Sequence, residues 1–246
     1  DIKPDVIINA AAYTGVDKAE SEVESARRVN EIGAANLAKA AANLGVPLIH
    51  VSTDYVFDGL AKQPYKETDA TGPTGVYGQT KLAGEDAVQA ICAKHIILRT
   101  AWVYSEYGSN FVKTMLRLAE TRDELNVVED QTGCPTYAGD IADAILKICL
   151  NISTNPDWGV YHYVGATQCT WPEFARTIFR EAETLGILVR QIAVRGIPSS
   201  DYPTPAERPK YSVLHCQKVK NTFDVSPIPL TQSLPRMLAA LKYQQD

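Results

Sequence analysis

The chain has 246 residues, 24 Lys and Arg against 29 Asp and Glu, a formal net charge of -5, and 45% hydrophobic content. This length and apolar content suffice to bury the core of one large domain or two small ones. The acidic balance provides no basic surface for nucleic acid or an anionic membrane, so we expect neither as a partner.

The five cysteines are scattered and form no C-x-x-C pair, and the four histidines form no H-E-x-x-H motif. We therefore expect a reduced protein without a structural zinc site. No apolar run approaches the roughly 20 residues of a membrane span, and the N-terminus lacks the basic-then-apolar pattern of a signal peptide. These features predict a cytoplasmic protein.

Strand-like and helix-like segments alternate along the first 130 residues. Short β-branched runs read as strands of the buried, parallel type, and Ala-rich stretches with apolar residues at helical spacing read as helices. Alternation of this kind predicts a parallel α/β sheet with crossover helices. The expected strands are Asp5–Ala12, Pro47–Ser52 and His95–Thr100; the expected helices are Val16–Leu44 (one helix or two abutting ones, stopped by Gly45), Tyr77–Ile91 and Gly108–Thr121.

The regular alternation of strand-like and helix-like segments ends after Leu125–Val128. A helix near 141–150, a strand over 159–164, a helix over 172–185 and a proline-rich run over 197–209 predict a smaller α+β lobe. The predicted organisation is therefore a Rossmann-like, doubly wound parallel sheet over 1–130, incomplete at its N-terminus, followed by a substrate-binding lobe over 131–246 whose helices return to the sheet.

The segment GVYGQTK places Tyr77 four residues before Lys81. Residues four apart lie on the same face of a helix, so the two side chains can converge on one point. An ammonium beside a phenol lowers the pKa of the phenol, which could then act as a general acid towards a carbonyl accepting a hydride. The chain has 12 tyrosines, so the spacing also arises by chance, and a surface Tyr with a solvated Lys is the plain alternative.

The context of the pair favours the catalytic interpretation. Thr53 ends the strand that precedes this helix, and ligands of doubly wound sheets bind at the carboxyl ends of strands. The Thr53 hydroxyl could hold the carbonyl oxygen that Tyr77 would protonate. The alternative is that Thr53 only caps the turn at the strand end.

Several motifs in order resemble one known family. The segments NAAAYTGVDKAE, VSTDYVFDG, YGQTKLAGE, RTAWVY, GSNFVKTML and DQTGCPT are similar to dTDP-4-dehydrorhamnose reductase of the extended short-chain dehydrogenase/reductase superfamily. The resemblance runs from Asp5 to about Leu150, with a weaker echo around Arg208. It implies an oxidoreductase that passes a hydride from NADPH or NADH to the C4 keto group of dTDP-4-dehydro-6-deoxy-L-mannose, giving dTDP-L-rhamnose for nucleotide-sugar and cell-surface polysaccharide biosynthesis.

The resemblance implies roles for the residues that match the family motifs. Thr53, Tyr77 and Lys81 would form the catalytic set: Thr53 would orient the carbonyl, Tyr77 would donate the proton, and Lys81 would bind the nicotinamide ribose. The segment Ala11–Thr14 (Ala11, Ala12, Tyr13 and Thr14) would lie along the cofactor. Relatives often have His at the place of Tyr13, and the two alanines are equally suited to close helix packing against the sheet.

Substrate contacts are implied for Asp54, Trp102, Gln131 and Arg208. An Arg suits a diphosphate because its planar fork can pair two oxygens. Each of the four has a structural alternative: a turn cap for Asp54, a core aromatic for Trp102, and a solvated loop side chain for Arg208 and likewise for Gln131.

No G-x-G-x-x-G or G-x-x-G-x-x-G fingerprint is present, although a dinucleotide-binding sheet should open with a glycine-rich turn. We therefore expect the sequence to be a fragment that begins about fifty residues into the family pattern. The acidic or basic residue that would select NADH or NADPH is expected within that preceding part, after its second strand. A homodimer and a Mg²⁺ ion at a subunit contact follow only from resemblance to some relatives.

Two other classes stay open. One is a non-catalytic regulatory subunit of the methionine adenosyltransferase beta type, which resembles this family; the intact Thr53, Tyr77 and Lys81 set favours the enzyme. The other is a sugar-nucleotide epimerase or dehydratase with the same Tyr-x-x-x-Lys chemistry. A dehydratase needs an acidic pair beside the strand-end Thr, whereas here a single Asp54 is followed by Tyr55.

Overall fold

The computed structural model describes residues 3–152 and 157–243, and its internal contacts divide the chain into two compact units. The first unit comprises Asp1–Thr100, Ala144–Tyr163 and Thr204–Ser226; the second comprises Ala101–Asp143, Val164–Pro203 and Pro227–Asp246. The sequence-based division near residue 130 follows chain order, whereas each unit collects three separated segments. The end of the strand–helix alternation marks where the types of element change. It does not show where the chain returns to an earlier unit.

The first unit is built on a four-stranded parallel sheet in the order β1 (Ile7–Asn9), β2 (Leu48–Thr53), β3 (His95–Thr100) and β8 (Gly159–His162). Thr53 pairs with Thr100 at the end of the register, so β2 and β3 finish together. This confirms the predicted parallel α/β architecture and all three strands expected in the first half, the first of them shortened to three residues.

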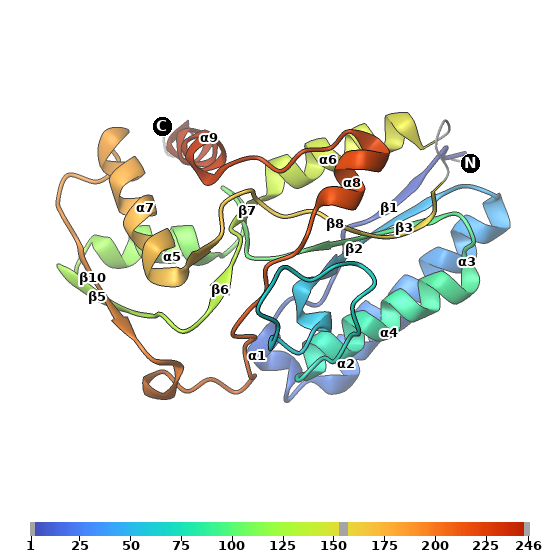
Figure 1. Cartoon of the computed structure of the whole chain (residues 1–246), viewed down its shortest axis with the longest axis horizontal. Helices are drawn as coiled ribbons and strands as arrows, with labels where there is room; N and C mark the ends of the chain where they lie inside the picture. The colour runs from blue at the N-terminus through green and yellow to red at the C-terminus, as the bar shows by residue number, and fades with distance from the viewer. Residues whose placement is uncertain (1–2, 153–156, 244–246) are drawn as a thin grey trace. The chain divides into compact units, whose positions relative to one another are not determined.

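Helices cover both faces of this sheet (Figure 1). On one face lie α3 (Ala34–Leu44) and α4 (Val76–Ile91), side by side; α8 (Gln217–Phe223) lies on the other face beside α6 (Ala138–Asn151). The helix α3 ends at Gly45, whose φ of 71° is the left-handed conformation expected of a glycine stop.

The expected helix over 16–44 is broken into shorter pieces: α1 (Val16–Ala19), α2 (Val23–Arg27), the π-helix η1 (Arg28–Gly33) and α3. The prediction of one helix or two abutting ones is therefore wrong between Ala19 and Val23. Glu20, in the gap, accepts a hydrogen bond from the backbone N–H of Val76 at 2.9 Å, a contact 56 residues away in sequence. Local periodicity carries no information about such a contact.

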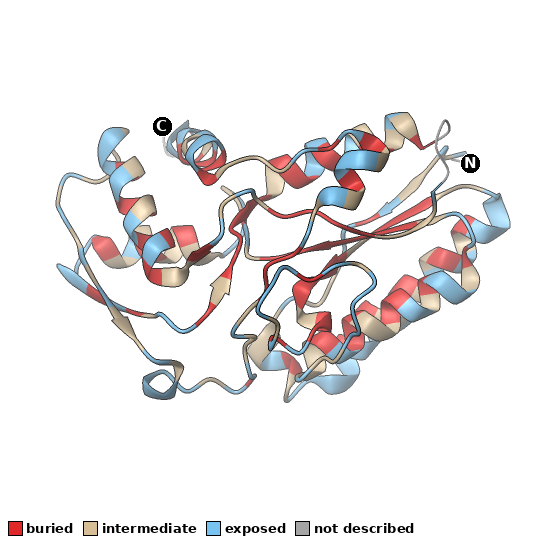
Figure 2. Cartoon of the chain, viewed as in Figure 1, coloured by how far each residue is buried: buried red, intermediate tan, exposed pale blue. Residues whose placement is uncertain are grey.

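The core of the first unit lies between β1–β3 and the two adjacent helices. Ala34, Ala38 and Ala41 line the buried side of α3, and Leu48 and Ile97 face them from the strands. Figure 2 shows this buried seam along α3 and α4 and the almost continuous burial of β2 and β3. The small side chains bring α3 close to the sheet, and this close packing fixes where α4 runs.

The second unit contains three two-stranded ladders: β4 (Val103–Tyr104) with β7 (Thr136–Tyr137), β5 (Glu124–Val128) with β10 (Ala193–Ile197), and β6 (Thr132–Gly133) with β9 (Cys169–Thr170). Its helices α5 (Phe111–Ala119), α7 (Trp171–Thr184) and α9 (Leu230–Tyr243) surround a core that includes Phe174, Ile178, Leu234 and Met237. The predicted helices of this half are present, each with ends shifted by a few residues.

Among residues 3–152 and 157–243, no helix is long and apolar enough to span a bilayer. All five cysteines are free thiols. Within the same described ranges, no group of three or more His, Cys, Asp or Glu side chains is arranged to hold a metal ion.

Candidate active site

Thr53 and Asp54 lie where β2 gives way to the short 3-10 helix η2 (Asp54–Val56). The Thr53 hydroxyl accepts from the backbone N–H of Tyr55 at 3.2 Å and donates to Asp54 Oδ1 at 3.0 Å. Thr53 therefore caps this turn, which is the structural role considered for it from the sequence. Asp54 accepts the hydrogen bond from the Thr53 hydroxyl. Burial raises the pKa of Asp54 to about 7, although hydrogen bonds from Thr53 and Ser212 oppose this shift.

Tyr77 stands in the first turn of α4, and its ring packs edge-on against Tyr55 at 5.4 Å between centroids. Glu20 fixes the start of the helix through the N–H of Val76. A Cβ on Gly78 would lie 2.2 Å from the carbonyl oxygen of Tyr55, so glycine allows the helix to approach the strand-end turn. The structure thus brings Tyr77 to Thr53, within one hydrogen-bonded group.

Burial raises the pKa of Tyr77 to about 12; the hydrogen bond with Thr53 lowers it and the nearby Asp54 raises it. The expectation that Lys81 lowers the pKa of Tyr77 is wrong for this structure. The Lys81 ammonium is directed to the sheet beneath, where it donates to the Val51 carbonyl at 2.7 Å and lies 3.4 Å from His50 Nε2.

Lys81 is itself almost fully buried, at 1% exposure. Burial lowers its pKa to about 8, while the Glu85 carboxylate one turn further along α4 raises it. Glu85 is held by Arg99, with Nη2 to Oε2 at 2.6 Å, and by the Ser52 hydroxyl at 2.5 Å. The side chains of Glu85, Arg99 and Ser52 are all buried, so they connect α4, β3 and β2 directly behind Lys81.

The segment Ala11–Thr14 follows the end of β1, and its backbone is fixed by two asparagines. Ala11 N–H donates to Asn9 Oδ1 at 3.1 Å, and Tyr13 exchanges two hydrogen bonds with the buried Asn30 in η1. The Tyr13 hydroxyl donates to Glu22, away from this backbone. Ala11 and Thr14 are exposed, so the segment offers small side chains and an open backbone, which fits a closely approaching dinucleotide.

Arg208 belongs to the same unit and forms a two-pronged ion pair with Asp17, at 2.8 and 3.1 Å. Both residues lie near enough to Tyr55 to influence the pKa of its phenol. The structure therefore brings Arg208 towards the Tyr55–Tyr77 pair, but its fork is already engaged by a carboxylate. A diphosphate would have to displace Asp17 or share the guanidinium with it.

Trp102 and Gln131 lie in the second unit, where Trp171 joins them. The Trp102 and Trp171 rings stack with centroids 3.5 Å apart, and Trp171 Nε1 donates to Gln131 Oε1 at 3.0 Å. Trp102 has a φ of 49°, in the left-handed region that bulky residues avoid. Strained backbone of this kind gathers at functional positions, which favours a binding role over simple core packing.

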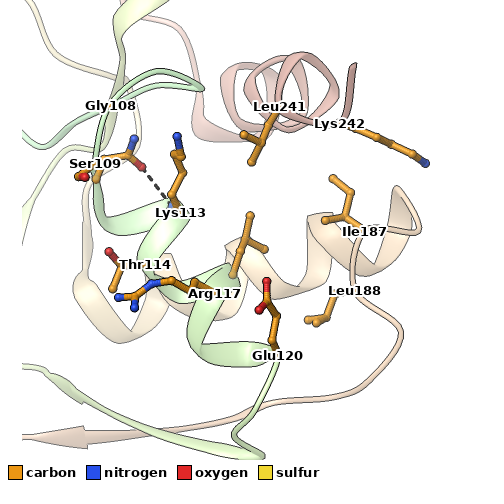
Figure 3. Close-up of a pocket in the computed structure, with 12 residues that line it drawn as sticks. Gly108, Ser109, Lys113, Thr114, Arg117, Glu120, Ile187, Leu188, Leu241 and Lys242 are labelled. Atoms are coloured by element: carbon orange, nitrogen blue, oxygen red, sulfur yellow. Dashed lines mark hydrogen bonds between the residues drawn. The ribbon is translucent and has the colours of Figure 1, made fainter. Parts of the chain in front are cut away.

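A cavity of about 550 Å³ occupies another part of the second unit (Figure 3). It lies between α5, α9 and the segment after α7, and it is lined by Lys113, Arg117, Glu120 and Leu188, among others. It contains none of the predicted site residues. Lys113 donates to the Glu106 carbonyl and Lys242 to the Leu185 carbonyl, so two of its cations already have partners.

Sequence reasoning missed several residues that contact the predicted positions: Trp171 in the second unit and, in the first unit, Asn9, Asp17, Asn30, His50, Glu85 and Arg99. Glu85 had a readable signal, because it follows Lys81 by one helical turn. The others join elements far apart in sequence, and single-sequence patterns carry no such pairing.

A parallel Rossmann-like sheet with Thr53 at a strand end and Tyr77 and Lys81 on the next helix defines an enzyme fold of the NAD(P)-dependent epimerase/dehydratase-like class. The family model described as "RmlD substrate binding domain" matches residues 1–243. The chain belongs to this family, that of the dTDP-4-dehydrorhamnose reductases.

Individual relatives agree. A dTDP-4-dehydrorhamnose reductase of Sinorhizobium fredii is 51% identical over 244 residues, covering 98% of this chain and 82% of that protein. The crystal structure of a dTDP-4-dehydrorhamnose reductase from Clostridium acetobutylicum superposes with a TM-score of 0.90 at 42% identity, covering 98% of this chain and 82% of the other. That of the Bacillus anthracis enzyme in complex with NADP gives a TM-score of 0.87 at 38% identity, covering 99% and 82%.

Proposed function

We propose that the chain is an NAD(P)H-dependent dTDP-4-dehydrorhamnose reductase of dTDP-L-rhamnose biosynthesis. The observation that carries the proposal is the convergence of Thr53 and Tyr77, with Lys81 one turn further on, in a chain about half identical to reductases of this name over almost its whole length. A reduced nicotinamide nucleotide supplies the hydride when it is bound.

The residues of this chain supply the proton and the orientation. Tyr77 keeps its proton at neutral pH, because its pKa is about 12, and donates it to the C4 oxygen as that oxygen gains charge. Thr53, which already meets the Tyr77 hydroxyl, orients the carbonyl. Lys81 holds the ribose and Ala11–Thr14 the adjoining part of the nucleotide; NADP in the Bacillus anthracis structure favours NADPH.

Substrate contacts are proposed for Asp54 and Arg208 in the first unit and for Trp102 and Gln131 in the second. We assign cofactor binding to residues 1–130, which also supply Asp54 and Trp102 as substrate contacts, and the substrate-binding lobe to 131–246, as the motif order suggests. Five free thiols support a reducing compartment, the cytoplasm. A homodimer and a bound Mg²⁺ ion are proposed by family resemblance alone, and sedimentation with and without a chelator tests both.

The decisive experiment follows 340 nm absorbance with the purified protein, NADPH or NADH, and dTDP-4-dehydro-6-deoxy-L-mannose. Tyr77→Phe should lower kcat by about 10²–10⁴-fold, the usual contribution of a general acid. Tyr107→Phe, at a tyrosine that is 70% exposed, is the matched control and should retain the wild-type rate. Nicotinamide binding without consumption in the wild type would favour a regulatory subunit; sugar turnover without net consumption would favour an epimerase.

A further inference from the structure

Two buried side chains that the proposed reaction does not use lie directly behind Lys81. Asn9 ends β1 and His50 lies in the middle of β2, at 4% and 1% exposure. Asn9 Nδ2 is 2.9 Å from His50 Nδ1, and His50 Nε2 is 3.4 Å from Lys81 Nζ. The three side chains form one line of polar contacts from β1 through β2 to α4.

The orientation of the Asn9 amide determines which nitrogen of His50 carries the proton. Asn9 Oδ1 accepts the backbone N–H of Ala11, so the amide must present its Nδ2 donor to His50. A nitrogen that accepts from an amide has no proton of its own, and a neutral imidazole then carries its single proton on Nε2. Burial and Lys81 keep His50 neutral by lowering its pKa to about 3.

We propose that His50 is a positioning residue for Lys81: fixed by Asn9 in the Nε2–H tautomer, it directs an N–H donor at the lysine and favours the neutral amine. This role rests on the proposed function for Lys81. An ammonium has three donors and no acceptor, whereas an amine can accept from Nε2–H. As an amine, Lys81 can therefore accept from His50 and still donate to the Val51 carbonyl.

The other groups facing Lys81 set the balance. Glu85 on the same helix favours the ammonium and is held by Arg99 from β3 and Ser52 from β2. The Val51 carbonyl accepts from Lys81 in either protonation state. Burial favours the amine and lowers the pKa of Lys81 to about 8, close to neutral pH. In the proposal, the Nε2–H of His50, 3.4 Å from Nζ, favours the amine further. Ala11, at the start of the proposed cofactor segment, is thus linked through Asn9 and His50 to Lys81.

The first test needs no substitution. Long-range ¹H–¹⁵N correlation spectra of the histidine-labelled protein at pH 7 report the tautomer of each buried imidazole. We expect His50 to show a protonated Nε2 and an unprotonated Nδ1. His162 provides the contrast within the same spectrum, because its Nδ1 lies 3.1 Å from the Tyr65 carbonyl and must carry the proton. A protonated Nδ1 at His50 would overturn the proposal.

The second test measures Lys81 itself, by titrating ¹³Cε-labelled lysine signals, with Lys81→Arg to identify the resonance. In His50→Gln, the amide oxygen can accept from the ammonium, so the pKa of Lys81 should rise by about one unit or more. His162→Gln, which replaces another fully buried histidine of the sheet, should leave it unchanged. An unchanged Lys81 titration in folded His50→Gln would refute the role.

Kinetics separate this inference from the proposed function. If the protein is a reductase, the alkaline limb of its kcat/KM profile should move upward in His50→Gln in parallel with the Lys81 titration. A protein that reduces no substrate but still shows the shifted lysine would lose the proposed function and keep the His50–Lys81 coupling. Normal reduction of substrate by His50→Gln with an unmoved alkaline limb would confirm the reductase and overturn the His50–Lys81 coupling.

Discussion

Burial controls the acid–base properties of the side chains at the end of β2. Tyr77 lies between a strand-end turn and the helix that carries it, and the removal of water raises the pKa of its phenol to about 12. A proton donor must hold its proton until the substrate takes it, so this shift suits the proposed role. The same burial keeps Asp54 protonated through much of the range below neutral pH.

Asp54 gives a prediction for a single residue. Its pKa rises from the ordinary 3.8 to about 7 on folding, so the folded state binds the proton more tightly and stability falls as pH rises from about 4 to 7. Asp54→Asn should remove this pH dependence, because an amide does not titrate. The amide oxygen can still accept the hydrogen bond from Thr53. Relative to the wild type, the variant should gain about 2–3 kcal/mol of unfolding free energy between pH 5 and pH 8.

Urea unfolding at the two pH values measures this difference. Asp58→Asn is the control, because Asp58 is a surface carboxylate whose pKa is lowered by Tyr65 and the Leu60 N–H. Parallel stability curves for the wild type and Asp54→Asn across this range would mean that Asp54 is ionised in the folded protein.

At the scale of elements, α4 carries both proposed catalytic residues and depends on close contacts for its position. A Cβ on Gly84 would lie 2.1 Å from the carbonyl oxygen of Asn30 in η1, so only glycine fits there without displacing the helix. Next to it, Glu85 reaches Arg99 in β3 and Ser52 in β2. The position of α4 therefore determines where Tyr77 and Lys81, the proposed catalytic residues, lie.

Gly84→Ala should displace α4 and destabilise the protein by about 2 kcal/mol or more, because the obstructing atom is backbone and cannot rotate away. Its kcat should fall with its thermal midpoint. Gly33→Ala, in the facing η1 helix, places its Cβ 3.4 Å from the nearest atom, and φ at this position is in the helical range. The substitution should be neutral or stabilising by up to about 1 kcal/mol. Equal midpoints for the two variants, read by calorimetry, would contradict this account.

The buried pair between Glu85 and Arg99 gives a second prediction for α4. Arg99→Met should destabilise the protein by about 3–5 kcal/mol, because it leaves Glu85 charged at 0% exposure with no bidentate cation partner, only the Ser52 hydrogen bond and the more distant charge of Lys81 among the described residues. The double variant with Glu85→Leu should recover most of that loss, since two apolar side chains leave no unpaired charge. A double-mutant cycle in urea measures the coupling; simple additivity of the two losses would show that the ion pair is not coupled.

At the scale of the whole molecule, the buried titratable groups act on stability in opposite directions. His50 and His162 are both neutral when folded, with pKa values lowered to about 3 by burial. Below pH 6.5 the unfolded chain binds protons that the folded protein does not, so their contribution is full above that pH and is lost as pH falls towards 3. Asp54 changes stability in the reverse direction over an overlapping range.

His162→Gln isolates one of these contributions. Between pH 7 and pH 5 the wild type should lose about 2 kcal/mol more unfolding free energy than the variant. The loss arises because His162 takes up a proton only when unfolding exposes its imidazole. Denaturant unfolding at both pH values supplies the comparison. If the two proteins lose equal amounts, His162 titrates normally in the folded state.

The amino-acid sequence by itself determined the parallel α/β class and the segment that forms each central strand. It also placed Thr53 at a strand end and Tyr77 four residues before Lys81. These are local properties: side-chain periodicity, glycine stops and residue spacing follow from backbone geometry alone. Family resemblance extended them to a reductase, which the relatives confirm.

The tertiary structure alone decided the direction of the Tyr77 pKa shift, the break between Ala19 and Val23, and the grouping of three separated segments into each unit. It also placed His50 and Asn9 behind Lys81 and paired Arg208 with Asp17. Each of these depends on burial or on a contact between residues distant in the chain. Water removed from a group and partners brought to it are products of packing, which no local pattern encodes.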